Sequence, residues 1–259
     1  MIFGKAITKY TMPFFALSVF ISVNAFSARA YAEQEGSFAV YQAFEKMRNE
    51  RMEKSAALYR DMVDQILTGD IEKLDFQTLR RVYSKSTYYV ADPDKIINRL
   101  YKLAATITDE KASSQDRDNA IQEYNILLSQ HLADIDVVQT AYGLSQSDIR
   151  LGRREILGQV MDGLRRSIVS VGRGTSFIDA YYVITAGEEV VLLQELGVKP
   201  YETEPVQAGA KTFLDINRVR DEETGETRDI YVNISVPMRE LYREHNKFKA
   251  MRNPASQLY

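Results

Sequence analysis

From residue 37 to residue 171, apolar side chains recur every three or four positions, the spacing of one face of an α-helix. The first stripe predicts a long helix that ends at Gly69, because glycine readily adopts the left-handed conformation of a helix C-terminus. A shorter helix is predicted to begin near Asp75, followed by a tyrosine-rich connector over residues 84–91. Further helices are predicted to begin at Asp92-Pro93, near residue 118, at Asp134 and at Ser147, with Gly172 after the last.

After Gly174 the pattern changes from helical spacing to short runs that are typical of strands. Residues 180–184 form an apolar run, and Thr185 with Glu188 forms a capping box that predicts a helix start. Residues 212–219 and the alternating residues 230–234 predict two strands joined by an acidic hairpin loop. Pro237 is predicted to open a last amphipathic helix. This part of the chain is therefore expected to be a small α+β unit.

The predicted fold class is α+β, mostly α: tetratricopeptide-like helical hairpins followed by a small α+β unit with a β-hairpin. Ala120, Tyr124 and Leu127 have the types and spacing of the second helix of such a repeat. Only this helix matches, so an ordinary helix bundle is an equal alternative. The predicted division is a signal peptide (1–32), a long helix (33–74), a helical-hairpin domain (75–171), the α+β unit (172–250) and a frayed tail (251–259).

The N-terminus has the pattern of a cleavable secretory signal. Lys5 and Lys9 precede an uncharged, largely apolar stretch over residues 10–28. Ala30 and Ala32 are the small residues that signal peptidase requires, so cleavage is predicted after Ala32, and the protein is expected to be periplasmic or secreted. The alternative is an uncleaved membrane anchor, although polar residues dilute the apolar run.

Composition excludes several classes of function. The chain of 259 residues has no cysteine, which excludes disulfides, thiolate chemistry and a lipid anchor. Its two histidines, His131 and His245, are far apart, so neither a metal nor another cofactor is expected. Signal cleavage removes three basic residues and no acidic one, lowering the formal charge from −3 to −6. An acidic protein lacks the basic surface that nucleic acids require.

An ordered set of short motifs connects the chain to a known family. The motifs are Asp75 to Arg80, Asp134 to Asp136, Gly172 to Ser176, Tyr182 to Thr185, Glu188-Glu189, Leu196 to Val198, Thr224 to Glu226 and Tyr231 to Asn233. From Asp75 to Pro237 the chain resembles the bacterial family catalogued as domain of unknown function 4919, except in the tyrosine-rich stretch before Asp92. The resemblance implies an exported bacterial protein with a helical-hairpin body, and it implies no catalytic residue.

Three groups of residues have types that could bind an anion or a cation or act as acids. Gly172, Arg173 and Gly174 could cradle an anion with backbone amides, but a glycine helix stop explains them better. Glu188 and Glu189 could act as a carboxylate pair, but adjacent helical residues diverge and helix N-termini attract acids. Asp134 with Asp136, like the loop 221–226, could bind a cation, but a helix cap and a solvated turn are simpler interpretations.

Tyrosines supply the candidate binding surface. Tyr83, Tyr88 and Tyr89 cluster in and after the second predicted helix, and tyrosine suits recognition surfaces. The alternative is core packing with the hydroxyls at the rim. Five arginines on the sixth predicted helix (Arg150, Arg153, Arg154, Arg165 and Arg166) could meet acidic partners, but they are more simply a solvated face.

These observations predict a non-catalytic module that binds a protein or peptide of the cell envelope in a helical groove. An envelope-polymer hydrolase that uses converging carboxylates is the first alternative, and a purely structural protein is the second. A membrane span is not expected after signal cleavage, and the pattern predicts no oligomeric state.

Overall fold

The computed structural model describes residues 15–220 and 224–252, with side chains over residues 42–220 and 224–243. Residues 1–14 of the predicted signal peptide, the side chains at its predicted cleavage site and residues 253–259 of the tail lie outside the described residues. The chain divides into two compact units, residues 1–50 and 51–259. The second unit therefore contains both the predicted hairpin domain and the predicted α+β unit.

Helix α1 (Phe15–Thr68) continues through the boundary between the units, so the predicted long helix begins earlier than expected. In the first unit, Phe44 and Met47 of the predicted apolar stripe are exposed, and Arg48 pairs with Glu45. In the second unit the stripe is largely buried, with Tyr59, Met62, Val63 and Ile66 in the core, but its predicted members Leu58 and Leu67 are exposed. Gly69 has a φ of 92°, which confirms that it follows the helix as a left-handed glycine.

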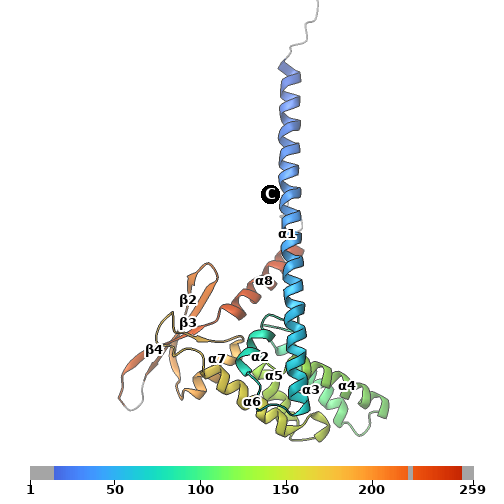
Figure 1. Ribbon diagram of the computed structural model, residues 1–259, viewed down its shortest axis with the longest axis vertical. Coiled ribbons are helices and arrows are strands. Elements are labelled where there is room, and N and C mark those ends of the chain that lie inside the picture. The colour runs from blue at the N-terminus through green and yellow to red at the C-terminus, as the bar shows by residue number, and fades with distance from the viewer. Residues whose placement is uncertain (1–14, 221–223, 253–259) are drawn as a thin grey trace, which may run out of the picture. The chain divides into compact units, whose positions relative to one another are not determined.

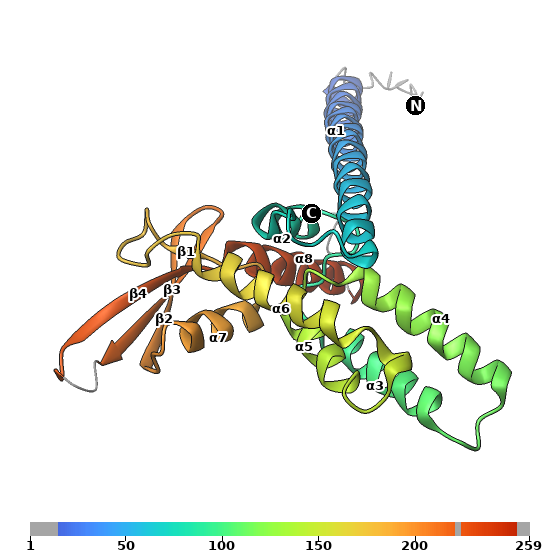
Figure 2. The same ribbon diagram turned by 60° about the horizontal axis from the view of Figure 1, so that its bottom comes forward.

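Five more helices form the body of the second unit: α2 (Phe76–Tyr83), α3 (Asp94–Thr108), α4 (Ser114–Gln130), α5 (Ile135–Leu144) and α6 (Arg154–Val169). Helix α3 packs beside α4, and α5 packs against α6 (Figures 1 and 2). Asp75 and Asp134 cap α2 and α5 through their side chains, as their positions predict. Ala120 and Tyr124 are buried, which suits the repeat and the bundle alike.

The start of α6 differs from the prediction, which placed it at Ser147. A short 3₁₀ turn, η1 (Ile149–Leu151), comes first, and Asp148 caps it by accepting the Arg150 N–H. Gly152 then has a φ of 118°, a conformation outside the helical region, and α6 begins only at Arg154. The aspartate and the glycine together interrupt the helix that the apolar spacing predicts.

The sheet contains β1 (Tyr181–Tyr182), β2 (Pro200–Gly209), β3 (Thr212–Arg220) and β4 (Thr227–Asn233) in the order β1-β4-β3-β2. Strand β1 runs parallel to β4, and the other pairs are antiparallel. The β3–β4 hairpin confirms the prediction, whereas β2 was not predicted. Strand β2 is almost entirely exposed, so no alternation of apolar and polar residues marks it in the sequence.

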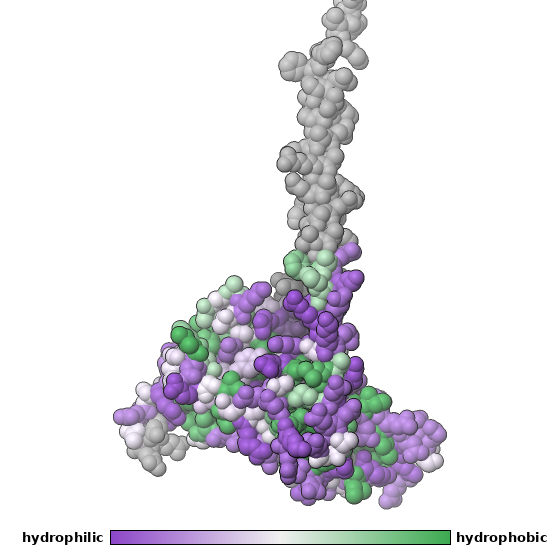
Figure 3. Space-filling model, in the orientation of Figure 1, coloured by the Kyte–Doolittle hydropathy of each residue, from purple (hydrophilic) through white to green (hydrophobic). Residues whose placement is uncertain are grey.

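Helices α7 (Ala186–Glu195) and α8 (Ser235–Arg252) complete the second unit, and the fold class is confirmed as α+β with mostly α-helix. One core runs from the helices to the sheet, where Val219, Ile230 and Val232 are buried. Polar and apolar side chains are interspersed on the face that Figure 3 shows. Within the described residues, no helix is both long and apolar enough to cross a membrane.

Gly172 gives a direct test of the turn between α6 and β1. Its φ is 82°, and a Cβ there would lie 2.4 Å from the Ala180 carbonyl oxygen. Gly197 has a φ of 66° but open space around it, so it is a matched control. We expect Gly197→Ala to cost about 1–2 kcal/mol of unfolding free energy from the backbone alone. Gly172→Ala should lower the unfolding free energy in urea by more than Gly197→Ala. An equal loss in the two variants would contradict the close approach of the Ala180 carbonyl to position 172.

Candidate functional site

A buried ion pair joins α2 to the start of α7. Arg80 donates from Nε to Glu188 Oε1 at 2.7 Å and from Nη2 to Glu188 Oε2 at 2.6 Å. Both side chains are almost fully excluded from solvent, at 2% and 1% exposure. Two parallel hydrogen bonds between a guanidinium and a carboxylate fix the orientation of both groups. The pair therefore sets how α7 begins relative to α2.

The same two side chains also bind the end of β1 and helix α6. Arg80 donates to the Tyr182 carbonyl at 2.9 Å and to Ser167 Oγ at 3.5 Å, while Glu188 Oε2 accepts the Ile184 N–H at 2.7 Å. Thr185 accepts the Glu188 N–H, which confirms half of the predicted capping box. The carboxylate does not complete the box, because it is committed to Arg80 and Ile184.

The predicted binding tyrosines lie in or against the core. Tyr83 is fully buried and its hydroxyl is 2.9 Å from His131 Nδ1, so it cannot belong to an exposed recognition surface. Tyr89 is half-buried and donates to the Ile184 carbonyl at 2.5 Å. Tyr88 is half-buried and accepts a hydrogen bond from Arg60. The core-packing interpretation is therefore correct for Tyr83. The rings of Tyr83 and Tyr88 both pack on Tyr59, and Tyr89 packs on Tyr83, so these rings form one aromatic layer.

His131 and Asp134 lie beside this layer and form no ion pair with any residue that the structure describes. Burial lowers the pKa of His131 to about 4 and raises the pKa of Asp134 to about 8. Asp134 Oδ1 accepts the Asp136 and Val137 N–H groups, but its Oδ2 has no hydrogen-bond partner within the described part of the chain. Asp134 is therefore a buried helix cap rather than a cation ligand.

The predicted anion cradle is already occupied by the chain itself. The N–H groups of Arg173 and Gly174 both donate to the Asp179 carbonyl, at 3.0 and 2.7 Å. The Arg173 guanidinium pairs with the Asp179 carboxylate at 2.6 Å. Because these donors have internal acceptors, the segment forms a glycine turn after the helix, which is the interpretation preferred over an anion cradle from the sequence.

Glu188 and Glu189 point to different partners, as their helical spacing predicts. Glu189 accepts a hydrogen bond from Asn217 Nδ2 at 2.7 Å, and its carboxyl group interacts with that of Asp215 on β3. Burial raises the pKa of Glu189 to about 7 and also raises the pKa of Asp215. A converging acid pair therefore exists, between α7 and β3 rather than between adjacent residues.

A pocket of about 1020 Å³, here called the acidic pocket, lies among α3, α5 and the first residues of α7, and Leu241 of α8 also lines it. Ile97, Tyr101, Leu144 and Leu241 give it an apolar body. Asp92, Asp94 and Asp136 supply three carboxylates, and no basic side chain lines it within the described residues. An apolar pocket with a few polar groups is the usual form of a ligand site.

Asp136 is the carboxylate that the fold holds most closely. Its Oδ2 would lie 1.8 Å from a Cβ at position 187, so only glycine allows this approach. Burial raises the pKa of Asp136, and the neighbouring charges of Glu188 and Asp94 act in the same direction. A positive charge close to Asp136 would stabilise its ionised carboxylate against burial and against the neighbouring negative charges. The acidic pocket therefore favours a cationic group.

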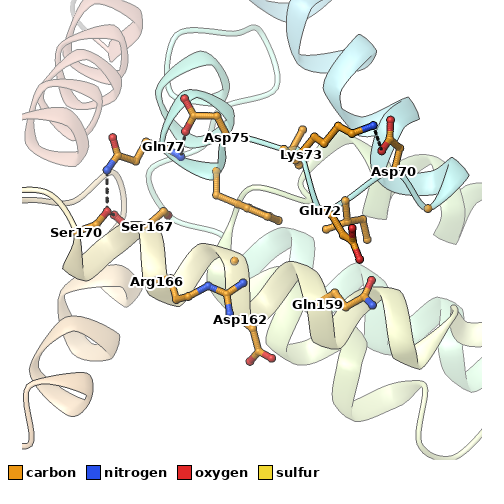
Figure 4. A pocket seen from close by; sticks show the side chains of 15 residues that line it. Asp70, Glu72, Lys73, Asp75, Gln77, Gln159, Asp162, Arg166, Ser167 and Ser170 are labelled. Atoms are coloured by element: carbon orange, nitrogen blue, oxygen red, sulfur yellow. Dashed lines mark hydrogen bonds and ion pairs between the residues drawn. The ribbon is translucent and has the colours of Figure 1, made fainter.

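A second pocket of about 680 Å³, here called the α6 pocket, lies between α6 and the segment from Gly69 to Gln77 (Figure 4). Its lining is polar and of mixed charge, with Glu72, Gln159, Asp162 and Arg166 around the opening. Of the five arginines predicted to share one face, Arg166 lines this pocket. The others have separate contacts: Arg150 with Asp148, Arg153 with the Leu67 carbonyl, Arg154 with the Tyr142 ring and Arg165 with Glu195.

Comparisons with protein-family models, with curated proteins and with solved structures find no match to this chain. No group of three or more acidic or histidine side chains among the described residues is placed to hold a metal ion. The burial of Arg80 and its pairing with Glu188 were not predicted from the sequence, although a signal was present. Arg80 lies four residues after Phe76, on the apolar face of its helix, and Glu188 precedes Val191 and Leu192 at the same spacing.

The buried pair has a matched control on the surface. Arg99 and Glu123 have the same two-bond geometry, 2.7 and 2.6 Å, but are about half exposed. Removing one partner of a buried pair costs about 3–5 kcal/mol, whereas an exposed pair contributes about 0–1 kcal/mol. We therefore expect Arg80→Met to lower the unfolding free energy in urea by several-fold more than Arg99→Met. Similar losses of unfolding free energy in the two variants would show that the buried pair matters no more to stability than the exposed pair.

The raised pKa of Asp134 predicts that the free energy of unfolding falls between pH 6.5 and pH 8. The native state retains the Asp134 proton up to a pKa of about 8, whereas the unfolded chain loses it near pH 4. Stability therefore falls as pH rises through this window, by about 2 kcal/mol over 1.5 pH units. His131 acts in the opposite direction, but only below about pH 6.5. The raised pKa of Glu189, about 7, adds a smaller decline in the same window. Asp134→Asn keeps a capping oxygen and should therefore remove most, but not all, of this slope in urea unfolding at several pH values.

Proposed function

We propose that this protein is an exported, non-catalytic binding module that takes a peptide segment of a cell-envelope protein into the acidic pocket. The proposal keeps the class of function that the sequence predicts but moves the binding surface away from Tyr83, Tyr88 and Tyr89. The observation that carries it is the lining of this pocket, which combines an apolar body with three carboxylates and, within the described residues, no basic side chain.

The lining suits a peptide in which a lysine or arginine lies beside apolar side chains. Tyr101 and Leu241 are exposed at 53% and 44%, so they offer apolar surface that a partner would cover. The carboxylates of Asp94 and Asp136 would bind the cationic side chain. Gln139 and Thr140 also line the pocket, and their amide and hydroxyl groups can bond a peptide backbone.

Export rests on the N-terminal pattern of the sequence. The two early lysines, the uncharged stretch and the small residues before Glu33 together support a cleavable signal, and they support a periplasmic or secreted location. The resemblance to domain of unknown function 4919 supports the same location. An envelope protein or peptide is therefore the partner class that such a module would meet.

The hydrolase alternative has one observation in its favour, the carboxyl pair of Glu189 and Asp215. A carboxyl group with a pKa of about 7 beside a second carboxyl group can supply an acid and a base. Neither residue, however, lines the acidic pocket or the α6 pocket. Because a hydrolase must place its substrate against its acid pair, the pockets favour the binding module.

Selection from a displayed library of random linear peptides, with the full chain as bait, tests the proposal. We expect enriched sequences to place lysine or arginine next to apolar residues. Asp94→Asn and Asp136→Asn should each weaken a synthetic enriched peptide about tenfold or more in calorimetry, because each removes a charged hydrogen-bond acceptor.

Two variants outside the pocket serve as matched controls for this experiment. Asp118→Asn removes an exposed carboxylate of α4, and Ile126→Ser removes an exposed apolar side chain of the same helix. Both should leave the affinity unchanged, while Leu241→Ser should reduce it. Failure to enrich any peptide, enrichment of acidic peptides, or equal effects of pocket and control variants would refute the proposal.

A further inference from the structure

The α6 pocket presents a stripe of polar side chains from one helix. Gln159, Asp162, Arg166 and Ser170 follow one another at spacings of three and four residues, so they lie on one face of α6. Glu72 faces the same opening from the segment that joins α1 to α2 (Figure 4). Two elements far apart in the sequence therefore supply the polar groups of this pocket.

The polar groups of the pocket fall into two sets. Some are used internally: Asp75 caps α2, Gln77 donates to Ser170 at 2.7 Å, and Lys73 lies 3.9 Å from Asp70. The other set comprises Glu72, Gln159, Asp162 and Arg166. Within the residues that the structure describes, these four side chains have no hydrogen-bond or ion-pair partner, although Asp162 and Arg166 have the spacing of a helical ion pair.

The floor of the pocket is rigid. The ring of Phe76 lies directly against α6 at Gly163, where a Cβ would be 2.2 Å from a ring carbon. Phe76 is also buried, as is Leu79 one turn later in the same helix. Close packing at this point holds the Gly69–Gln77 segment at a defined distance from α6, so the backbone on both sides of the pocket is fixed.

From this arrangement we infer that the α6 pocket binds a neutral oligosaccharide. Vicinal hydroxyl groups both donate and accept hydrogen bonds, and the free groups of the pocket match them. The carboxylates of Glu72 and Asp162 accept, the Arg166 guanidinium donates in a planar fork, and the Gln159 amide does both. Planar side chains of this kind bind adjacent hydroxyls in pairs, which an isolated ammonium group cannot do.

The charges of the pocket exclude two other ligand classes from the inference. Glu72, Asp75 and Asp162 outnumber Arg166 once Asp70 and Lys73 are paired, so an anionic ligand would be repelled. A strongly cationic ligand would meet the guanidinium of Arg166 in the middle of the stripe. A neutral polyhydroxylated ligand meets neither penalty. This site is independent of the proposed peptide pocket and takes a different chemical class.

A glycan array that carries neutral and charged oligosaccharides, probed with the full chain, tests the inference. We expect signals from neutral glycans, followed by calorimetry with the strongest neutral binder in solution. Asp162→Asn, Arg166→Gln and Gln159→Ala should each weaken that binding, by about tenfold or more for the two charged positions. Circular dichroism and thermal melting establish that each variant is folded.

Glu155→Gln is the matched control, because it removes an exposed carboxylate from the same helix but outside the pocket. It should bind the glycan as the unaltered chain does. Gln159 is exposed and unbonded, so its substitution keeps the test informative even if a charged variant fails to fold. Absence of any glycan signal, binding of anionic glycans alone, or unchanged affinity in folded Asp162→Asn and Gln159→Ala would overturn the inference. Peptide selection at the acidic pocket is a separate measurement, so either proposal can fail alone.

Discussion

The arrangement of the second unit depends on one buried ion pair between Arg80 and Glu188. Burying two charges costs several kcal/mol per ion, and their attraction offsets this only if the remaining donors and acceptors are also bonded. Here the Tyr182 carbonyl, the Ile184 amide and Ser167 provide those bonds. The pair therefore joins α2, α6, the end of β1 and the first turn of α7 in one geometry.

The first turn of α7 also connects this pair to the acidic pocket. Gly187 directly precedes Glu188, and the Asp136 carboxylate lies against it. Because Arg80 holds Glu188, the neighbouring backbone of Gly187 is fixed by the buried ion pair. The Asp136 carboxylate lies against this fixed backbone. The wall of the pocket is thus supported by a second layer of buried polar groups. Such support is what keeps a binding group in place while its ligand is absent.

A layer of tyrosines fills part of the interior of this protein, while the carboxylates of its two pockets lie nearer the surface. Tyr59 and Tyr83 are fully buried, and the hydroxyls of Tyr59, Tyr83 and Tyr89 bond the Ala133 amide, His131 and the Ile184 carbonyl. Large rings with one polar atom can fill a core layer and satisfy buried backbone groups at the same time. The acidic pocket combines carboxylates with an apolar body, whereas the α6 pocket offers carboxylate, amide and guanidinium groups. They differ in charge and apolar content, so they suit different ligands.

The sequence by itself determined the features that depend on a few neighbouring residues. Asp75, Asp134 and Thr185 cap helices, and Gly69 and Gly172 follow them with positive φ, because capping and glycine conformation are local effects. Helix spacing and the β3–β4 alternation were also sufficient to predict the fold class. Strand β2 was not predictable in this way, since its exposed side chains have no period and its pairing comes from β3.

Only the tertiary structure decided the partners of charged groups. Arg80 and Glu188 are 108 residues apart, and Glu189 meets Asp215 only because α7 packs on the sheet. Arg80 and Glu188 lie on the apolar faces of their helices, which indicated that both are buried. The sequence did not indicate that the two residues pair with each other. The amides of Arg173 and Gly174 resembled an anion cradle until the fold supplied the Asp179 carbonyl as their acceptor. Pairing between distant residues depends on how the elements pack, and local spacing carries no information about it.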